Sequence, residues 1–374
     1  MKLRPARLAF AVCGIWLFAG YAGSAANTLA PEARPTPTTQ VARAASGVVA
    51  LQKWYDHSSG LYESTGWWNS ANALTVLIDF ARVSKTRQFD SVFANTFAAA
   101  QKTFPGFLNK FYDDEGWWAL AWIDAYDLTR DRRYLSMAES IFADMAGGWD
   151  STCGGGIWWS KDRGYKNAIA NELFLSVAAH LAKRDRSQSA RYLGWANREW
   201  KWFSQSGMIN SEGLVNDGLG SRSGHTTAQM CRNNGQRTWT YNQGVLLGGL
   251  AELSRLQPDA SIAQTAQRVA MAAVIKLVDS HGVLHETCEA KCGADGVQFK
   301  GIFVRNLRAW NAAAPRQQYA SFIITNANSI WLNDQGPGVL FGLVWSGPFD
   351  GSNAGGQSSA LDAIVSAAIL EQGY

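Results

Sequence analysis

Two adjacent aspartates, Asp113 and Asp114, are the residues of this chain most suited to chemistry. They lie in the run Phe-Tyr-Asp-Asp-Glu-Gly-Trp-Trp, residues 111–118, just before an apolar pattern of helical spacing. Paired carboxyl groups beside aromatic side chains are typical of glycoside cleavage, in which one protonates the leaving oxygen and the other attacks or stabilises the anomeric carbon. The alternative is a helix cap, in which an aspartate accepts hydrogen bonds from free backbone N–H groups.

Tryptophan gives the second strong signal. The chain contains 17 tryptophans, with consecutive pairs at residues 67–68, 117–118 and 158–159, and Trp239 and Tyr241 follow later. A tryptophan ring presents a flat apolar face and one N–H donor, which suits stacking on a sugar ring. Since tryptophan is heavily buried on average, core filling is the alternative for each of them. Their clustering at expected helix starts favours a cleft.

Amides and carboxylates accompany the aromatic residues in the same loops and first helical turns. They are Asn72, Asn167, Asn171, Asn216, Asp217, Asn242, Gln243 and Gln298. Each of them alone is typical of a cap or a turn. Together they offer the hydrogen-bonding groups that sugar hydroxyls need, and the sequence therefore predicts a carbohydrate groove.

The elements that must position these residues are helices. Apolar residues recur at helical spacing, each time ended by a breaker, in segments 71–83, 89–104, 117–128, 133–145, 167–181, 192–205, 243–256 and 260–278. Weak strand patterns occur at 323–325 and 339–344.

A repeat underlies this series, with a period of roughly 50 to 75 residues. An aromatic loop rich in Asn or Gly leads into a helix, and a second helix runs back. Such loops lie near residues 66–69, 114–117, 165–167, 240–242, 297–299 and 355–358. Six hairpins closed into a ring predict an all-α (α/α)6 toroid, in which the loops of one face line a single cleft.

The spacing of the two aspartates also bears on mechanism. Consecutive residues of a helix point about 100° apart, whereas extended backbone just before the helix lets both carboxyls face one cleft. Adjacent Cα atoms lie about 3.8 Å apart. Retaining glycosidases hold their carboxyls about 5 to 5.5 Å apart, and inverting ones about 6.5 to 9.5 Å. The short separation is easier to reach here, and crowding of like charges raises one pKa, as a general acid requires.

The N-terminus has the pattern of a secretory signal. A basic start with Lys2, Arg4 and Arg7 precedes an apolar run to Phe18, and small residues at 22–26 offer a cleavage site. We therefore expect a signal peptide at 1–26, a leader at 27–46 and a single catalytic domain at 47–374. The net charge of +4, without a basic stripe, argues against a nucleic-acid partner.

Four cysteines follow the signal: Cys153, Cys231, Cys288 and Cys292. An even number in a secreted chain predicts two disulfides. A local 288–292 bridge, with 153–231 as the longer one, is one of the three connectivities that the sequence permits, and free buried thiols are the alternative. None of the five histidines has zinc-finger spacing to a cysteine, so no metal is expected.

Five longer motifs resemble glycoside hydrolase family 76, the endo-α-1,6-mannanases. They lie at 112–121, 153–160, 167–174, 238–244 and 298–303, and the likeness runs from about Trp54 to the C-terminus. The resemblance implies an (α/α)6 toroid and retaining cleavage of α-1,6-mannoside bonds. It implies that Asp113 is the nucleophile, that Asp114 is the acid/base and that Asp217 lines a subsite. It implies no metal and no cofactor.

The residues proposed to bind substrate combine the aromatic loops with these motifs. They are Trp67, Trp68, Asn72, Trp117, Trp118, Asn171, Asp217, Trp239, Tyr241, Asn242, Gln243, Gln298 and Lys300. The chain is thus predicted to be a secreted, monomeric endo-acting hydrolase of α-1,6-linked mannan or manno-oligosaccharides.

Two other functions stay open at this stage. One branch of the family resembles fungal cell-wall transglycosylases, which act on the mannose core of glycolipid anchors and carry an apolar C-terminal tail. Here Asp362 and Glu371 interrupt the last apolar run, which predicts a final amphipathic helix and no membrane anchor. Transfer on the same linkage remains possible, because a hydroxyl can replace water. The other alternative is a mannan-binding protein without turnover, which would have no need for two crowded carboxylates.

Overall fold

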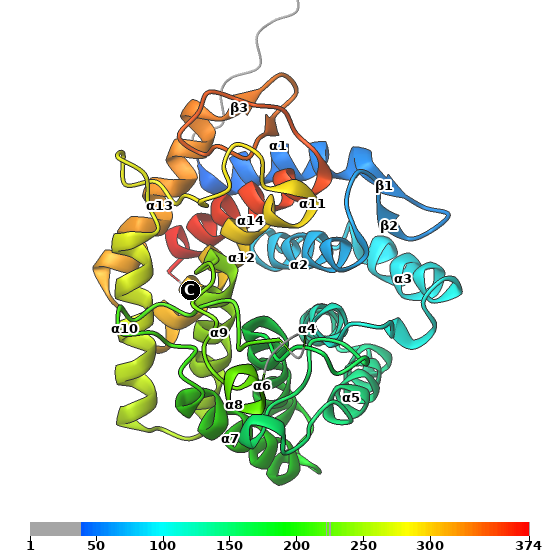
Figure 1. Cartoon of the computed structure of the whole chain (residues 1–374). Coiled ribbons are helices and arrows are strands. Elements are labelled where there is room, and N and C mark those ends of the chain that lie inside the picture. Colours follow the sequence, from blue (N-terminus) through cyan, green and yellow to red (C-terminus); the bar gives the residue numbers. More distant parts are fainter. Residues whose placement is uncertain (1–38, 222, 224–225, 374) are drawn as a thin grey trace, which may run out of the picture. The chain divides into compact units, whose positions relative to one another are not determined.

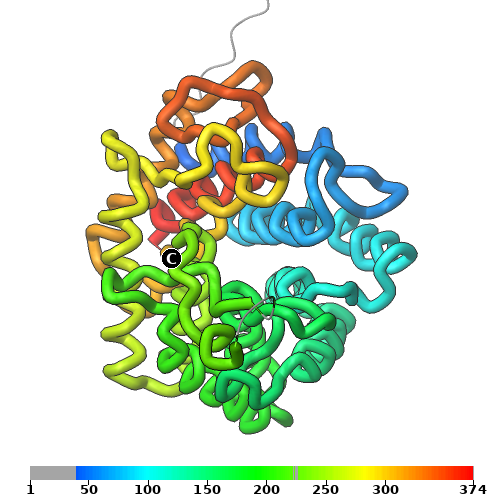
Figure 2. Tube along the Cα trace, in the orientation of Figure 1, coloured from blue at the N-terminus to red at the C-terminus, as the bar shows by residue number. Residues whose placement is uncertain are grey.

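Six helices pack side by side in a closed ring in the computed structural model, which describes residues 39–221, 223 and 226–373 (Figures 1 and 2). In chain order these inner helices are α2 (Trp67–Ser84), α4 (Tyr112–Thr129), α6 (Ala168–Arg184), α9 (Thr240–Leu256), α12 (Phe299–Ala313) and α14 (Ala354–Glu371). Each contacts the next, and α14 contacts α2, so the ring closes.

Six further helices alternate with the inner ones along the chain and lie outside them. They are α1 (Gln40–Leu51), α3 (Asp90–Ala99), α5 (Arg132–Ala146), α7 (Ser189–Gln205), α10 (Ala260–Lys276) and α13 (Gln317–Asn333). Helices α1 and α13 pack on α14, α5 on α4, α7 on α6 and α10 on α9. Phe97 of α3 packs edge-on against Trp122 of α4. This alternation is the (α/α)6 toroid that the sequence predicts.

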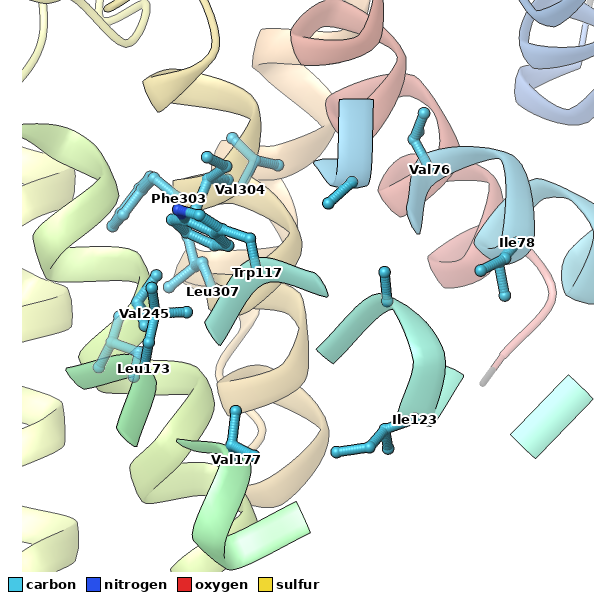
Figure 3. Packing of buried hydrophobic residues seen from close by; sticks show 14 of the residues in the cluster. Val76, Ile78, Trp117, Ile123, Leu173, Val177, Val245, Phe303, Val304 and Leu307 are labelled. Carbon is cyan, nitrogen blue, oxygen red and sulfur yellow. The ribbon is translucent and has the colours of Figure 1, made fainter. Parts of the chain in front are cut away.

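The inner helices approach closely because glycines lie where their backbones meet. A Cβ atom added to Gly244 of α9 would lie 2.6 Å from the Cα atom of Phe303 in α12. One added to Gly301 of α12 would lie 2.5 Å from the Cα atom of Ser359 in α14. Only glycine permits such contacts. Around them the apolar side chains of α4, α6, α9 and α12, among them Leu173 and Val245, fill the space between the helices (Figure 3).

Helix α14 differs from the amphipathic helix expected at the C-terminus. Every residue from Ala354 to Ile369 is buried. The helix closes the ring and is surrounded by α1, α2, α12 and α13, so it has no solvent face. Its one buried acid, Asp362, is paired with Arg305 of α12 at 2.9 Å, which offsets the cost of burying that charge.

Three further boundaries differ from the sequence-based expectation. Helix α1 begins at Gln40, inside the segment 27–46 assigned to a leader, because Ala44 and Val48 pack into the core. The weak strand pattern at 323–325 lies within α13, whose buried residues Tyr319, Ile323, Ala327 and Ile330 follow helical spacing. The segment 339–344 does contain a short strand, β4 (Leu340–Phe341), paired with β3 (Gln335–Gly336).

The connecting loops carry the remaining elements. A short hairpin, formed by the two-residue strands β1 (Tyr55–Asp56) and β2 (Leu61–Tyr62), precedes α2. Helices α8 (Thr227–Met230) and α11 (Gly293–Gly296) are single turns. Two disulfides fasten these loops, Cys153–Cys231 and Cys288–Cys292. This is the pairing with a local bridge that the spacing suggested. The predicted signal peptide lies outside the described residues.

No helix in the described part of the chain combines the length and apolar character needed to cross a bilayer.

Candidate active site

The aspartate pair lies in the first turn of inner helix α4, and not in the extended backbone before it. Helix α4 begins at Tyr112, and its N-cap residue is Phe111, which makes no side-chain capping bond. Neither Asp113 nor Asp114 is therefore the N-cap of this helix. Both stand where the positive end of the helix dipole favours negative charge.

Asp113 faces a cavity at this end of the ring. Its Oδ2 atom accepts a hydrogen bond from the Trp159 indole N–H at 3.0 Å. Its buried Oδ1 atom has no hydrogen-bond partner among the described residues. Burial, and next to it the charge of Asp114, raise the pKa of Asp113 well above its ordinary value.

Asp114 is held from the other side, by the preceding loop. Its Oδ2 atom accepts a hydrogen bond from the side-chain amide of Asn109 at 2.5 Å. Burial raises the pKa of Asp114 to about 6, the bond from Asn109 opposes this rise, and the charge of Asp295 adds to it. The pair therefore keeps a proton in mildly acidic solution, which is the condition for general acid catalysis.

The cavity measures about 230 Å³. Its wall combines aromatic rings with three carboxylates, and most of it comes from the N-terminal turns of α2, α4, α9 and α12 and from the N-cap residue of α6. The lining residues are Trp68, Asp113, Trp117, Trp159, Tyr165, Asn167, Asp217, Tyr241, Asp295 and Phe299. The loops of one face of the ring thus meet at one site, as the repeat predicted.

Stacked rings form a continuous aromatic surface in this cavity. The Trp117 ring lies between Trp68, with ring centroids 5.6 Å apart, and Tyr241, at 6.5 Å. Tyr241 in turn stacks on Phe299 at 3.9 Å. Such a surface suits the apolar C–H face of a pyranose, with the indole and phenol groups as polar edges.

Two further carboxylates are fixed beside this surface. Asp217 accepts hydrogen bonds from the Tyr165 hydroxyl at 2.5 Å and from the Trp239 indole N–H at 3.2 Å. Asp295, in the single turn α11, accepts one from the Trp68 indole N–H at 2.9 Å. Carboxylates held in this way can accept hydrogen bonds from substrate hydroxyls.

The family described as Glycosyl hydrolase family 76 matches residues 40–373. This chain belongs to glycosyl hydrolase family 76. Its match covers all twelve helices of the ring, from α1 to α14.

Relatives and solved structures agree with this membership. The chain is 27% identical to the mannan endo-1,6-alpha-mannosidase DCW1 of Candida albicans over 354 residues, which cover 85% of this chain and 74% of that protein. It is 28% identical to DCW1 of Saccharomyces cerevisiae, covering 70% of this chain and 61% of that protein.

The fold matches that of an α-1,6-mannanase, GH76A of Salegentibacter sp. HEL1_6, with a TM-score of 0.80. The two are 23% identical, and the match covers 88% of this chain and 99% of that one. That structure is of an inactive variant in which two consecutive aspartates are replaced by alanine, in complex with α-1,6-mannotetrose. Dfg5 of Chaetomium thermophilum, solved with glucosamine, matches with a TM-score of 0.78 at 22% identity, covering 89% and 90% of the two chains.

Within this family fold, the residues proposed to bind substrate separate into two groups. Trp68, Trp117, Asp217 and Tyr241 line the cavity with Asp113. Trp239 lies at the edge, in a neighbouring hollow that it shares with Asp217.

The other aromatic candidates pack against the core or within it: Trp67 is partly buried and Trp118 fully buried. Trp67 stacks on Phe104 with ring centroids 4.0 Å apart and packs against Trp118 at 4.7 Å. These residues stabilise the contact between α2 and α4, and the sugar-stacking role assigned to them from the sequence is not supported by their position.

The polar candidates outside the cavity hold loops and helices together. Asn171 bonds both backbone groups of Ile157, and Gln243 bonds those of Val215. Gln298 bonds Asn69 and Ser358, Lys300 bonds Glu289 at 2.6 Å, and Asn72 accepts from Arg305. Asn242 is buried without a hydrogen-bond partner among the described residues. The polar atoms of these residues are hydrogen-bonded within the protein or enclosed in its interior. These residues therefore hold the loops and helices that carry the lining residues.

Several lining residues were absent from the final selection of substrate-binding residues: Trp159, Tyr165, Asn167, Asp295 and Phe299. Asn167 and the 158–159 tryptophan pair had been named as groove candidates, and Tyr165 and Phe299 stood in loops already singled out. The sequence around Asp295 contains no recognisable motif. The one feature that could have indicated a fixed position is the preceding Cys288–Cys292 bridge, which fastens its loop. The described residues contain no group of three potential metal ligands.

Proposed function

We propose that this family 76 enzyme cleaves α-1,6-mannosidic bonds within mannan by a retaining double displacement. The observation that carries the proposal is the aspartate pair in the first turn of α4, with Asp113 facing a cavity of stacked rings and fixed carboxylates. The names of the curated relatives, and the mannotetrose bound by the Salegentibacter variant, support the choice of linkage.

In this mechanism Asp114 protonates the glycosidic oxygen while Asp113 attacks the anomeric carbon, so that a mannosyl ester forms and the reducing-end fragment leaves. Asp114 then removes a proton from water, which attacks the same carbon and releases Asp113. The place of Asp113 in the cavity wall supports the nucleophile role. The pKa of about 6 for Asp114 suits a group that gives and later takes a proton.

The two carboxylates beside the rings suit a manno-configured substrate unit bound near the reacting carbon. Asp217 and Asp295 are both held by aromatic N–H or O–H groups, so their remaining lone pairs can accept from sugar hydroxyls. We expect them to orient the sugar and not to take part in bond cleavage. The signal pattern at 1–26 and the two disulfides support action outside the cytoplasm. We expect the enzyme to act there as a monomer.

The test is release of reducing ends from unbranched α-1,6-mannan by the wild type and by the variants Asp113→Asn and Asp114→Asn. Asp114→Asn should lose roughly 10²- to 10⁴-fold in rate, the range attributed to a positioned acid–base group. Asp113→Asn should lose activity as well, because it removes the nucleophile. Asp90→Asn is the matched control, because Asp90 also lies in the first turn of a helix but belongs to outer helix α3. Survival of activity in either site variant, with its circular dichroism unchanged, would contradict the assignment.

Two further measurements resolve the finer points. Proton NMR of the first-formed product should show the α-anomer, as retention requires, and a β-anomer would exclude the ester intermediate. Thin-layer chromatography with added mannobiose as acceptor separates hydrolysis from transfer. Predominance of longer products would assign the chain to transglycosylation, and the absence of any product would favour a binding protein.

A further inference from the structure

A second cavity, larger than the one at the aspartates, lies at the opposite end of the inner helices. Its volume is about 780 Å³, which is within the usual range of roughly 300 to 1,000 Å³ for small-molecule sites. Its walls come from the C-terminal halves of α2, α4, α6 and α9 and from α12. The proposed chemistry uses none of these residues.

Positive charge dominates this cavity. Eight arginines and lysines line it, against four carboxylates, and its histidine, His180, is neutral because burial lowers the pKa to about 4. Part of this excess answers the helix dipoles, since each C-terminal end carries about half a negative charge, roughly 2.5 charges for five helices. Asp362, which lies outside the lining, neutralises Arg305, so three cations remain in surplus. They exceed that amount, and the cavity as a whole attracts anions.

Carboxylates of this cavity are shared among cations, so some N–H donors of those cations have no carboxylate partner. Glu252 alone contacts Arg184 at 2.9 Å, Arg255 at 3.2 Å and Lys183 at 3.3 Å. Asp79 and Asp127 contact two cations each, whereas Asp124 contacts Arg82 alone, at 3.9 Å. Three of the four carboxylates are therefore shared between cations.

Two cationic residues of this cavity have N–H groups without a partner among the described residues. The Nε atom of Arg308 is buried and has no hydrogen-bond partner in the described part of the chain, although its Nη2 atom contacts Asp79 at 2.8 Å. A buried, unpaired guanidinium N–H is costly and is normally satisfied by water or by a ligand. Arg186 is exposed at the rim of the cavity and forms no ion pair with any described residue.

We propose that this cavity is a second binding site, for a compact anion with at least two negative charges, such as a diphosphate or a polycarboxylate. The anion accepts hydrogen bonds from Arg308 at the wall and from Lys183 and Arg186 at the rim. Arginine forks suit bidentate contacts to phosphate or carboxylate oxygens. A neutral mannan chain finds no equivalent here, because aromatic lining is confined to Tyr126 among the residues described around this cavity.

The experiment is isothermal titration calorimetry with inorganic diphosphate and, separately, citrate, at an ionic strength matched with sodium chloride. The wild type should bind at least one of them with a 1:1 stoichiometry. The rim variant Lys183→Gln/Arg186→Gln should weaken binding at least tenfold, and Arg308→Gln should weaken it further. Arg191→Gln, an exposed arginine on outer helix α7, should bind like the wild type.

Arg308→Gln also breaks an ion pair, so loss of binding in that variant alone could reflect unfolding of the protein. The rim variant separates the two causes. Both rim residues are exposed, so their replacement leaves the core intact. No binding of either probe by the wild type would overturn the proposal. So would equal affinity of the rim variant and the wild type, which would mean that the anions bind elsewhere.

Discussion

The hydrogen bond from Trp159 to Asp113 is the contact whose loss should report most directly on the aspartate pair. Replacing Trp159 by Phe keeps an aromatic ring at the cavity but removes the indole N–H that lies 3.0 Å from the Oδ2 atom of Asp113. This bond favours the ionised form of Asp113 and so opposes the effect of burial on its pKa. Without it, the pKa of Asp113 rises further.

The size of the effect follows from the nature of the bond. A hydrogen bond to a charged group contributes about 1.5 to 3 kcal/mol. Trp159 is 37% exposed, which places this bond at the lower end of that range because water screens it. A loss of about 1.5 kcal/mol corresponds to roughly a tenfold change. We therefore expect kcat/KM to fall about tenfold at acidic pH, where Asp113 must be ionised to act as a nucleophile.

The assay is the pH dependence of kcat/KM on α-1,6-mannan for the wild type and Trp159→Phe. The acidic limb should move to higher pH, since activity requires loss of a proton whose pKa has risen. Trp239→Phe is the control, because its indole N–H also bonds a carboxylate of this site, Asp217, but not Asp113. An acidic limb that stays in place in Trp159→Phe, or moves to lower pH, would refute the role of this bond.

Other predictions concern the pKa of Asp114, the packing of the helical ring and the Cys153–Cys231 disulfide. Asp295→Asn removes a negative charge that raises the pKa of Asp114, so the basic limb, where protonated Asp114 is lost, should move to lower pH in the same assay. Gly301→Ala should lower the melting temperature by several degrees without changing KM, because its methyl group would collide with the backbone of α14; an unchanged melting temperature would contradict the close approach. The double variant Cys153→Ser/Cys231→Ser opens a loop of 78 residues and should lose about 4 kcal/mol in urea unfolding, whereas no loss would indicate that the loop is ordered without the bridge.

The helical ring could be predicted from sequence because periodicity and repeat agreed. The six loops expected to begin inner helices lie at the starts of α2, α4, α6, α9, α12 and α14. The error at 323–325 arose because Ile-Ile-Thr favours strand locally. Burial of Ile323 and Ile330 on one face of α13 decided the outcome.

The site was harder to predict because the sequence does not say which way a side chain points. In each tryptophan pair one member faces the cavity and the other the core. Trp68 lines the cavity while Trp67 packs against Phe104, and Trp117 lines it while Trp118 is fully buried. A turn of about 100° per residue separates the members of a helical pair. Composition alone therefore identifies the right loops, but only five of the thirteen residues that it assigns to the sugar lie at this cavity or its edge.

The division of roles between the two aspartates depends on where a single proton rests. In the free protein, burial raises the pKa of both carboxyls, and the charge of Asp114 raises that of Asp113 as well. The proposed mechanism needs Asp113 ionised and Asp114 protonated. The Trp159 N–H and the N-terminal end of α4 favour negative charge on Asp113. A bound mannoside supplies the missing element, because its glycosidic oxygen accepts a hydrogen bond only from a protonated Asp114. We therefore expect the substrate to complete the reactive proton arrangement, and the pair to be competent only when a sugar occupies the cavity.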